Sequence, residues 1–567
     1  MSCLFNSYDP YFKQPFGALR AGQTVRLTLC IPEELGYVDP HLVLQKEGKY
    51  DVPVHYRMKF DGQTPQQNHF SVELPLNDPG LYFYYFDLYT DFRRIVRGPD
   101  NCGVVSWQEG EKWQITVYEP DFQTPECIKG KVFYQIFPDR FCEGIENKPM
   151  PFPDRLYQAD KHAEPFWQPN ETGGHLNEDY FGGDLEGIRI KLPYLREMGV
   201  DYLYPNHRYN TADYLNVDPL LGTNEEFEVL CREAAKYGIG IVLDGVFSHT
   251  GSDSRYFNRE GRYGEGGAYR DPNSPYRSWY DFDPKYKGGY RSWWGFETLP
   301  EVNEENPSYV EFITGEGGVI DTWLRRGAAG FRLDVADELP DDFIEKIRAA
   351  VKRVSPEKFL LGEVWEDATT KYGFGQRRTY LLGKGLDSVM NYPFKNAVLD
   401  FVKGKPAEQA MGEILSICEH YPAPAMDTAL NFLSTHDTER ALTVIADEPA
   451  NGRGREWQSG RCVTGEAYEE GMLRLRMAYA IIYTLPGVPC LYYGDEIGMQ
   501  GYRDPFNRAF FCWDSHEKRL KPVLAQLAQL RHTCEAFRTG ELRVLRAQDG
   551  ILHYQRVGEA ETAEVIV

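Results

Sequence analysis

Residues 330–351 read GFRLDVADELPDDFIEKIRAAV, a short apolar run followed by a stretch in which apolar residues recur every three to four positions. The first pattern is typical of a buried strand and the second of an amphipathic helix. Other apolar runs of the strand type lie between residues 132 and 494: VFYQIF, DYLYP, GIVLDGVF, FLLGEV, SVMNY, ALNFLS and CLYYG. Eight strand–helix units over roughly 400 residues predict an α/β fold, a TIM (β/α)8 barrel.

The regions around these units predict the domain organisation. We do not favour a doubly wound sheet, because no G-x-G-x-x-G turn follows the first strand. Residues 1–122 hold short β-branched and aromatic runs separated by turn signals, which predict an antiparallel β-sandwich. The barrel is assigned to residues 123–540, and residues 248–307 are too long for a simple loop and predict an inserted subdomain after the third strand. Residues 541–567 look like the start of a C-terminal β domain that stops in mid-pattern and leaves an open sheet edge.

Composition excludes several classes of function. The 567 residues include 62 basic and 85 acidic side chains, a net charge of −23, which argues against nucleic acid or an anionic membrane as a partner. The longest apolar run, residues 477–485, has about half the length of a membrane span. The 11 cysteines include no C-x-x-C pair, which argues against a zinc site or a redox motif. Free thiols and the absence of a secretory leader pattern favour the cytoplasm.

Three acidic residues follow apolar runs directly: Asp334, Glu363 and Asp437. If these runs are barrel strands, all three carboxylates lie at the carboxyl-terminal face, where barrel enzymes build their sites. The alternative is that each acid caps a helix or forms a salt bridge at the rim. Because Arg332 and His436 stand beside them, we favour a functional site, and glycoside cleavage is the chemistry that suits carboxylates without metal-ligand spacing. One carboxylate attacks the anomeric carbon, a protonated one serves the leaving oxygen, and a third stabilises the cationic transition state.

Several motifs in order along the chain carry a family resemblance: KVFYQIFPDRF, YFGGDLEGI, VLDGVFSHTG, LPEVN, GFRLDVADE, LLGEVWE, FLSTHDTER and GVPCLYYGDEIGMQGYRDPFNR. At these motifs the chain resembles the α-amylase family, glycoside hydrolase family 13. Within that family it is most similar to the neopullulanase, cyclomaltodextrinase and maltogenic amylase group. The resemblance covers most of the chain.

The resemblance implies roles for particular residues. Asp334 would be the nucleophile, Glu363 the general acid and base, and Asp437 the residue that stabilises the transition state by holding sugar hydroxyls. Retention of configuration would place the carboxyls of Asp334 and Glu363 about 5–5.5 Å apart. Residues that would contact substrate are Tyr209, His249, Arg332, Trp365, His436, Asp504 and Arg508. Of these, Tyr209 would stack on the sugar at the cleavage point. Supporting roles would fall to Asp244, which orients the arginine, and to His207.

The chain also departs from the family's pattern. Ser248 stands where the family usually has Asn, which predicts a weaker structural hydrogen bond or cation ligand. The connection LYPNHRYNTADY lacks an apolar stretch that the group carries before the Asn-His pair, so the pocket floor and Tyr209 are expected to shift. No cofactor is required, and calcium is doubtful because few ligands remain near the first strand. Gly182 and Asp184 are the surviving candidates.

The resemblance predicts a retaining α-glucan hydrolase acting on cyclodextrins, maltooligosaccharides or pullulan. It also predicts a homodimer formed through the N-terminal domain, with no nucleic acid or membrane partner. Two alternatives stay open: a glucanotransferase that uses the same covalent intermediate, and a catalytically impaired glucan-binding relative. The preference between α-1,4 and α-1,6 bonds also stays open at this point.

Overall fold

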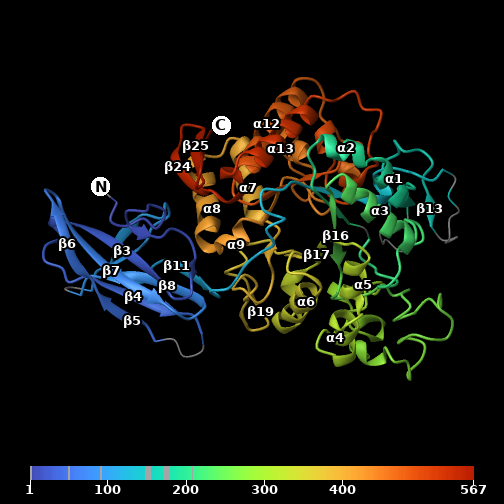
Figure 1. Ribbon diagram of the computed structural model, residues 1–567, viewed down its shortest axis with the longest axis horizontal. Helices are drawn as coiled ribbons and strands as arrows, with labels where there is room; N and C mark the ends of the chain where they lie inside the picture. The colour runs from blue at the N-terminus through green and yellow to red at the C-terminus, as the bar shows by residue number, and fades with distance from the viewer. Residues whose placement is uncertain are drawn as a thin grey trace.

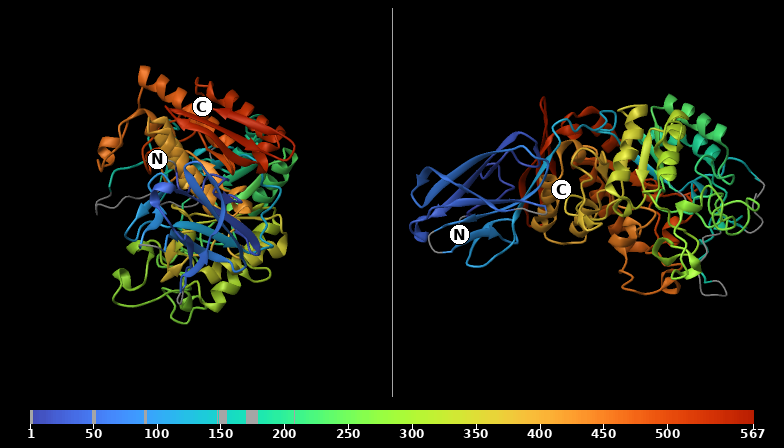
Figure 2. Two further views of the ribbon diagram at one scale, coloured as in Figure 1. Left: turned by 90° about the vertical axis from the view of Figure 1, so that its left-hand side faces the viewer. Right: turned by 90° about the horizontal axis from the view of Figure 1, so that it is seen from below.

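The computed structural model describes residues 3–48, 52–89, 92–146, 148, 155–169, 179–206 and 208–567, so that His207 lies outside the described residues. The chain folds into a central body of strands surrounded by helices, with a group of N-terminal strands projecting from one end (Figure 1). The same elongated arrangement is seen from below in the right-hand view of Figure 2. The C-terminal strands lie against the central body, on the side that faces the N-terminal strands (Figure 1).

The N-terminal strands form two sheets that share one apolar core. The strands are β1 (Lys13–Gln14), β2 (Leu19–Arg20), β3 (Gln23–Pro32), β4 (His41–Lys46), β5 (Val54–Arg57), β6 (Lys59–Thr64), β7 (Gln67–Leu76), β8 (Gly80–Asp87), β9 (Arg94–Arg97), β10 (Gly103–Ser106) and β11 (Trp113–Tyr118). One sheet has the order β1-β3-β7-β6, and the other runs β10-β9-β8-β11-β2 with β4 and β5 added at β8. Val25, Leu27 and Leu29 alternate along β3 and are all buried, as one face of a strand requires.

Eight parallel strands form the centre of the body. They are β12 (Phe133–Ile136), β15 (Tyr202–Pro205), β16 (Gly240–Gly245), β17 (Gly330–Leu333), β18 (Phe359–Gly362), β21 (Ser388–Val389), β22 (Leu430–Phe432) and β23 (Val488–Tyr492). Their order is β21-β18-β17-β16-β15-β12-β23-β22, and a parallel bridge from Met390 to Leu430 joins the two ends. The predicted (β/α)8 barrel is therefore confirmed, with each strand beside its neighbour in the chain.

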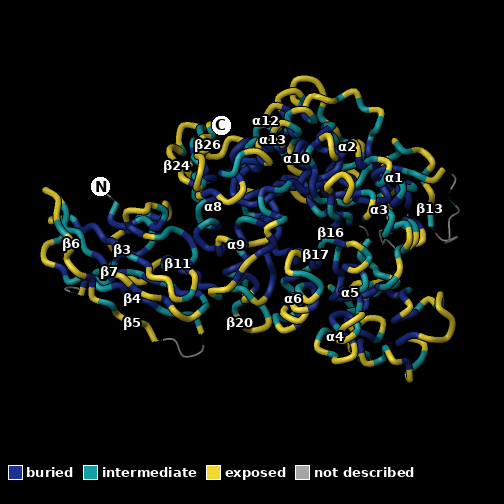
Figure 3. Tube along the Cα trace, viewed as in Figure 1, coloured by how far each residue is buried: buried dark blue, intermediate teal, exposed yellow. Residues whose placement is uncertain are grey.

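Helices surround this barrel and cover it with their apolar faces. Those of six residues or more in the described chain are α1 (Leu185–Ile190), α2 (Leu192–Glu197), α3 (Asn224–Lys236), α4 (Pro307–Thr314), α5 (Val319–Arg325), α6 (Asp341–Val354), α7 (Tyr392–Val402), α8 (Ala407–His420), α10 (Ala441–Ala446), α12 (Gly465–Thr484) and α13 (Leu520–Thr533). Helix α3 begins with a capping box, in which Thr223 and Glu226 each accept from the other's backbone amide. Helix α6 buries Phe343, Ile347 and Val351 at helical spacing. Figure 3 shows the resulting buried centre and exposed rim.

A cavity of about 240 Å³ lies between one side of the barrel and helices α1, α3 and α5. Apolar side chains from both layers line much of it: Ile136, Leu185, Ile188, Leu203, Leu221, Phe227, Leu230, Ile241, Val319, Trp323 and Phe331. Residues that follow β15, among them Asn206, Tyr209 and Asp213, also line it. Empty apolar volume weakens a fold because the lining atoms lose contacts, at about 24 cal/mol per Å³.

We expect Leu230→Phe to stabilise the barrel, because Leu230 lines this cavity and is 2% exposed. The larger ring fills part of the empty volume, which is worth about 0.5–1 kcal/mol. Calorimetry should show the melting temperature rising by about one to two degrees. Leu475→Phe is the matched control, since Leu475 is fully buried in α12 and does not line the cavity. That variant should melt lower, by overpacking, and a lower melting temperature for Leu230→Phe as well would contradict the prediction.

Two further regions complete the fold. Residues 248–306 have short 3-10 turns and no α-helix, α4 begins at Pro307, and the rings of Tyr256, Phe257 and Trp279 are buried there. The C-terminal strands β24 (Glu541–Gln548), β25 (Ile551–Val557) and β26 (Thr562–Ile566) form an antiparallel sheet. Among the described residues, no helix combines the length and the apolar character that crossing a membrane demands.

Candidate active site

The three acids that follow apolar runs lie at one face of the barrel. Asp334 directly follows β17, Glu363 directly follows β18, and Asp437 lies five residues beyond β22. Because the barrel strands are parallel, these positions are all at the carboxyl-terminal face. Asp334 and Glu363 are 6% and 3% exposed, and Asp437 is partly exposed. The buried carboxylates of Asp334 and Glu363 therefore lie beside the carboxylate of Asp437, which reaches solvent.

Arg332 connects these acids. Its guanidinium is fully buried, and its Nη1 lies 2.8 Å from Asp334 Oδ1 and 2.8 Å from Asp244 Oδ1. Its Nη2 lies 2.8 Å from Glu363 Oε2. One buried cation thus faces three carboxylates, and this excess of negative charge favours a proton on one of them.

The local environment separates the acids in their tendency to ionise. Burial raises the pKa of Glu363, and the nearby charge of Asp437 adds to the rise while Arg332 opposes it. Burial also raises the pKa of Asp334, again against the effect of Arg332. Burial works against ionisation of Asp437, but His436 and then Arg508 lower the pKa of that carboxyl below its usual range. The site can therefore hold a proton on the Asp334–Glu363 pair while Asp437 stays ionised.

Three neighbouring groups position Glu363, and the sequence analysis had identified only one of them, Trp365. The backbone amide of Val335 donates to Glu363 Oε2 at 3.0 Å, and Val335 has a φ of 40°, a strained value for a β-branched residue. On the other oxygen, Trp365 Nε1 donates at 3.2 Å and the Tyr392 hydroxyl at 3.4 Å. The Trp365 ring stacks on Tyr392 with 4.3 Å between centroids. Tyr392 follows β21 closely, so the same strand-end rule that selected the acids would have found it.

Asp437 lies among the other predicted contacts. Its Oδ2 is 2.9 Å from His436 Nε2 and its Oδ1 is 3.3 Å from Arg508 Nη2. Arg508 also pairs with Asp504, whose Oδ1 is 3.1 Å from Nη1, and donates from Nε to the backbone oxygen of His436 at 2.9 Å. The loop after β22 and the loop after β23 are thereby fixed to each other.

His249 is engaged on both ring nitrogens. Burial lowers its pKa to about 4, so the ring is neutral near pH 7. Its Nε2 lies 3.0 Å from the backbone oxygen of Tyr209, which can only accept, so Nε2 carries the hydrogen. Nδ1 then accepts from the Ser248 hydroxyl at 2.9 Å. The Tyr209 backbone oxygen therefore sets the tautomer of His249, and Ser248, which stands where the family usually has Asn, donates to the remaining ring nitrogen.

Tyr209 lies within the same pocket and engages the second histidine. Its hydroxyl contacts His436 Nε2 and lies 3.0 Å from Asp244 Oδ2, while Asn206 Nδ2 donates to it at 3.2 Å. The rings of Tyr209 and His436 are 5.4 Å apart and nearly parallel. Gln135 Nε2 lies 2.9 Å from the other ring nitrogen of His436. The connection after β15 thus places Tyr209 against both histidines that the resemblance assigns to substrate contact.

The calcium candidates lie elsewhere, next to residues 143–148. Asp184 caps α1, and its Oδ1 accepts from the amides of Gly187 at 2.7 Å and Gly144 at 3.1 Å. Lys148 Nζ is 3.6 Å from Asp184 Oδ2, and Lys161 Nζ is 3.0 Å from Glu143 Oε2. Glu143 lies against Gly182. Two ammonium groups and backbone donors already satisfy these carboxylates, so the described residues do not fit calcium, which needs six to eight oxygen ligands.

Comparison with known proteins places this arrangement in a family. Residues 135–531 match the model described as alpha amylase, catalytic domain. An amylopullulanase from Thermoanaerobacter thermohydrosulfuricus is 33% identical over 97% of this chain, although the chain spans only 40% of that relative's length. A cyclomaltodextrinase from Geobacillus thermopakistaniensis (strain MAS1) is 31% identical over 79% of this chain and 70% of its own length.

A solved structure supports the same comparison. The type III pullulan hydrolase from Thermococcus kodakarensis has a TM-score of 0.66 to this chain, with 25% identity. The match covers 99% of this chain and 93% of that one. The likeness therefore includes the N-terminal strands and the C-terminal sheet as well as the barrel.

Proposed function

The chain belongs to the α-amylase family, as its motifs predicted, and we propose that it is a retaining glycoside hydrolase that cleaves α-glucosidic bonds in short or cyclic α-glucans. The observation that carries the proposal is that Asp334 and Glu363 both lie 2.8 Å from the buried guanidinium of Arg332 at the carboxyl ends of the barrel strands. Relatives named amylopullulanase, cyclomaltodextrinase and neopullulanase support this choice of substrates.

The proposed reaction has two displacements. Asp334 attacks the anomeric carbon while Glu363 gives its proton to the departing glycosidic oxygen, which leaves a glucosyl ester on Asp334. Glu363 then takes a proton from water, and the water oxygen displaces Asp334, so that the α configuration is retained. The Glu363 oxygen that lies near Arg332 and Val335 is held by donors. Oε1 accepts from the uncharged groups of Trp365 and Tyr392, whereas Oε2 lies beside the cation of Arg332, so Oε1 is the oxygen better suited to carry the proton.

Sugar release tests this proposal directly. We would measure reducing ends liberated from β-cyclodextrin, pullulan and soluble starch, and follow the anomer of the first product by proton NMR. Early α product that appears with the full chain and not with Glu363→Gln supports the proposal. Early β product would exclude a retaining mechanism. A sugar acceptor that captures the glucosyl group in preference to water would identify a glucanotransferase.

A second candidate, a catalytically impaired glucan-binding protein, is favoured by the position of Tyr209. Its hydroxyl and its backbone oxygen engage His436 and His249, so a sugar would have to displace these contacts before its own hydroxyls could bind. Calorimetric binding of maltooligosaccharides without release of reducing ends would support this candidate. Turnover by the full chain would exclude it.

We expect Tyr209→Phe to lower KM for maltotriose by about 2–10-fold with little change in kcat. The hydroxyl that competes with substrate for His436 is removed, and one such hydrogen bond is worth about 0.5–1.5 kcal/mol, while the ring remains available for stacking. Tyr214→Phe is the control, because Tyr214 is buried nearby and its hydroxyl contacts the backbone oxygens of Val246 and His249 rather than His436. A higher KM in Tyr209→Phe would mean that the hydroxyl itself binds substrate.

We also propose a homodimer formed through the N-terminal sheets. Large apolar side chains are exposed there, among them Tyr37, Phe60, Phe92 and Trp107, and exposed aromatic surface is typical of interfaces. Light scattering of the full chain tests this. A single species with the mass of one chain, 65.3 kDa, at all concentrations would contradict it.

A further inference from the structure

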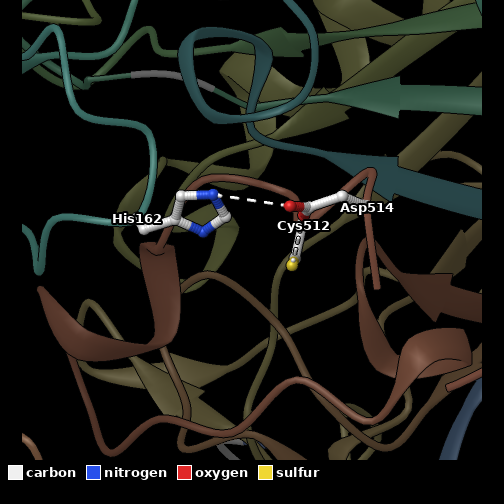
Figure 4. A group of neighbouring side chains, drawn as sticks. All are labelled: His162, Cys512 and Asp514. Carbon is white, nitrogen blue, oxygen red and sulfur yellow. Dashed lines mark hydrogen bonds and ion pairs between the residues drawn. The ribbon is translucent and has the colours of Figure 1, made fainter. Parts of the chain in front are cut away.

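Three side chains from two distant parts of the chain come together outside the acidic site. Within the described part of the chain, His162, Cys512 and Asp514 are the group of potential metal ligands whose ligand atoms all lie within 4.8 Å of one another. His162 Nε2 is 3.7 Å from Asp514 Oδ2, and Cys512 Sγ is 3.0 Å from Asp514 Oδ1. Figure 4 shows the imidazole facing the carboxylate, with the thiol beside it.

The two loops that carry these side chains are held together independently of them. Trp513, between the two ligands of the second loop, donates from Nε1 to the backbone oxygen of Phe141, at the start of the first loop, at 2.6 Å. Lys161, next to His162, lies 5.4 Å from the ring of Phe510. The backbone therefore brings the three groups close without relying on contacts among them.

We propose that His162, Cys512 and Asp514 bind one Zn²⁺ ion. An imidazole nitrogen, a thiolate and a carboxylate oxygen are the zinc ligands of proteins, at about 2.0–2.3 Å from the metal. Tetrahedral ligands at such lengths lie roughly 3.3–3.8 Å from one another, so side-chain rotation is enough to close the present spacing. The thiolate selects against calcium and magnesium, and water would complete the fourth position.

The sequence analysis argued against zinc because these three ligands are not grouped in any zinc-binding sequence motif. His162 is 350 residues from Cys512 along the chain, and no C-x-x-C pair is involved. Only the packing of the loop after β12 against the loop after β23 brings them together. Bound zinc would tie the first loop to the segment that carries Asp504 and Arg508, which lie eight and four residues before Cys512.

Zinc binding at this site must release a proton. Cys512 donates its thiol hydrogen to Asp514 Oδ1 at 3.0 Å, so the sulfur carries a proton before a metal binds. The reaction is thiol plus Zn²⁺ giving zinc thiolate plus one proton to solvent.

Cobalt titration of the full chain, after treatment with a chelator, tests the site. Co²⁺ takes the same ligands as zinc and gives a thiolate-to-cobalt charge-transfer band in the near ultraviolet. We expect one equivalent of Co²⁺ to produce this band, and one equivalent of Zn²⁺ to remove it. Cys512→Ser should abolish the band, and His162→Ala should weaken Co²⁺ binding at least about tenfold. Cys462→Ser, at an exposed cysteine elsewhere, should behave like the unaltered chain.

The outcomes separate the proposal from surface binding and from misfolding. The melting temperature of metal-free Cys512→Ser should match that of the metal-free parent, and Zn²⁺ should raise it only in the parent. No charge-transfer band in the parent, or an undiminished band in Cys512→Ser, would overturn the proposal. Equal Zn²⁺ stabilisation of parent and Cys512→Ser would do so too. None of these readouts depends on glucan hydrolysis.

Discussion

We expect Asp334→Asn to lower kcat for maltotriose by about 10⁴-fold or more and to leave the fold unchanged. An amide of the same shape cannot form the glucosyl ester, and loss of a nucleophile is typically this costly. The fold should tolerate the change, because Arg332 keeps Asp244 and Glu363 as partners and one of three crowded negative charges is removed. Steady-state kinetics and circular dichroism on the same preparation measure both effects.

The matched control and a trapping experiment make this prediction specific. Asp337→Asn changes an acid three residues away that pairs with Lys371 at 2.9 Å, and its rate should stay within about twofold of the parent. A 5-fluoro-glycosyl fluoride should leave a covalent adduct on the peptide that contains Asp334. An adduct on another residue, or a rate for Asp334→Asn close to that of the control, would reject the nucleophile assignment.

Glu363→Gln should reduce hydrolysis of unactivated glucans by about 10²–10⁴-fold, the usual contribution of a positioned general acid. With α-maltosyl fluoride as substrate, the variant's rate of forming the glucosyl ester should fall much less, because fluoride leaves without needing a proton. Burial raises the pKa of Glu363, so the parent keeps its acid protonated to higher pH and loses rate as pH rises through that pKa. The variant should lack this alkaline limb.

Glu366→Gln is the control for this position. Glu366 is three residues further on, is largely exposed and pairs with Lys371 at 2.9 Å, so its rate and pH profile should match those of the parent. If Glu363→Gln lost equal activity on glucans and on the fluoride, Glu363 would have a role other than proton donation. An alkaline limb that persisted in Glu363→Gln would assign that limb to another group.

Sequence was sufficient for the barrel and for the convergence of its acids. Runs such as GFRLDV specify a buried strand through local periodicity, and a parallel barrel brings the ends of its strands to one face. Asp334 and Glu363 were therefore expected to meet before any contact was known. Their roles remain proposals, as does the predicted separation of their carboxyls.

Tertiary structure alone decided how the pocket is filled. The sequence indicated that an apolar stretch is missing after β15. It did not indicate that the Tyr209 hydroxyl contacts His436 or that the Tyr209 backbone oxygen contacts His249. Ser248 illustrates the same limit, since its substitution was visible but its hydrogen bond to His249 was not. A contact of this kind depends on where a loop returns, which the local pattern does not encode.

The sequence by itself thus determined the barrel, the family and the acids at the strand ends, because periodicity and short motifs act over a few residues. Only the tertiary structure placed Lys148 and Lys161 on the carboxylates where calcium was doubtful, and His162 beside Cys512. These are contacts between side chains on separate loops. They depend on how the barrel packs those loops together, and distance along the chain carries no record of that packing.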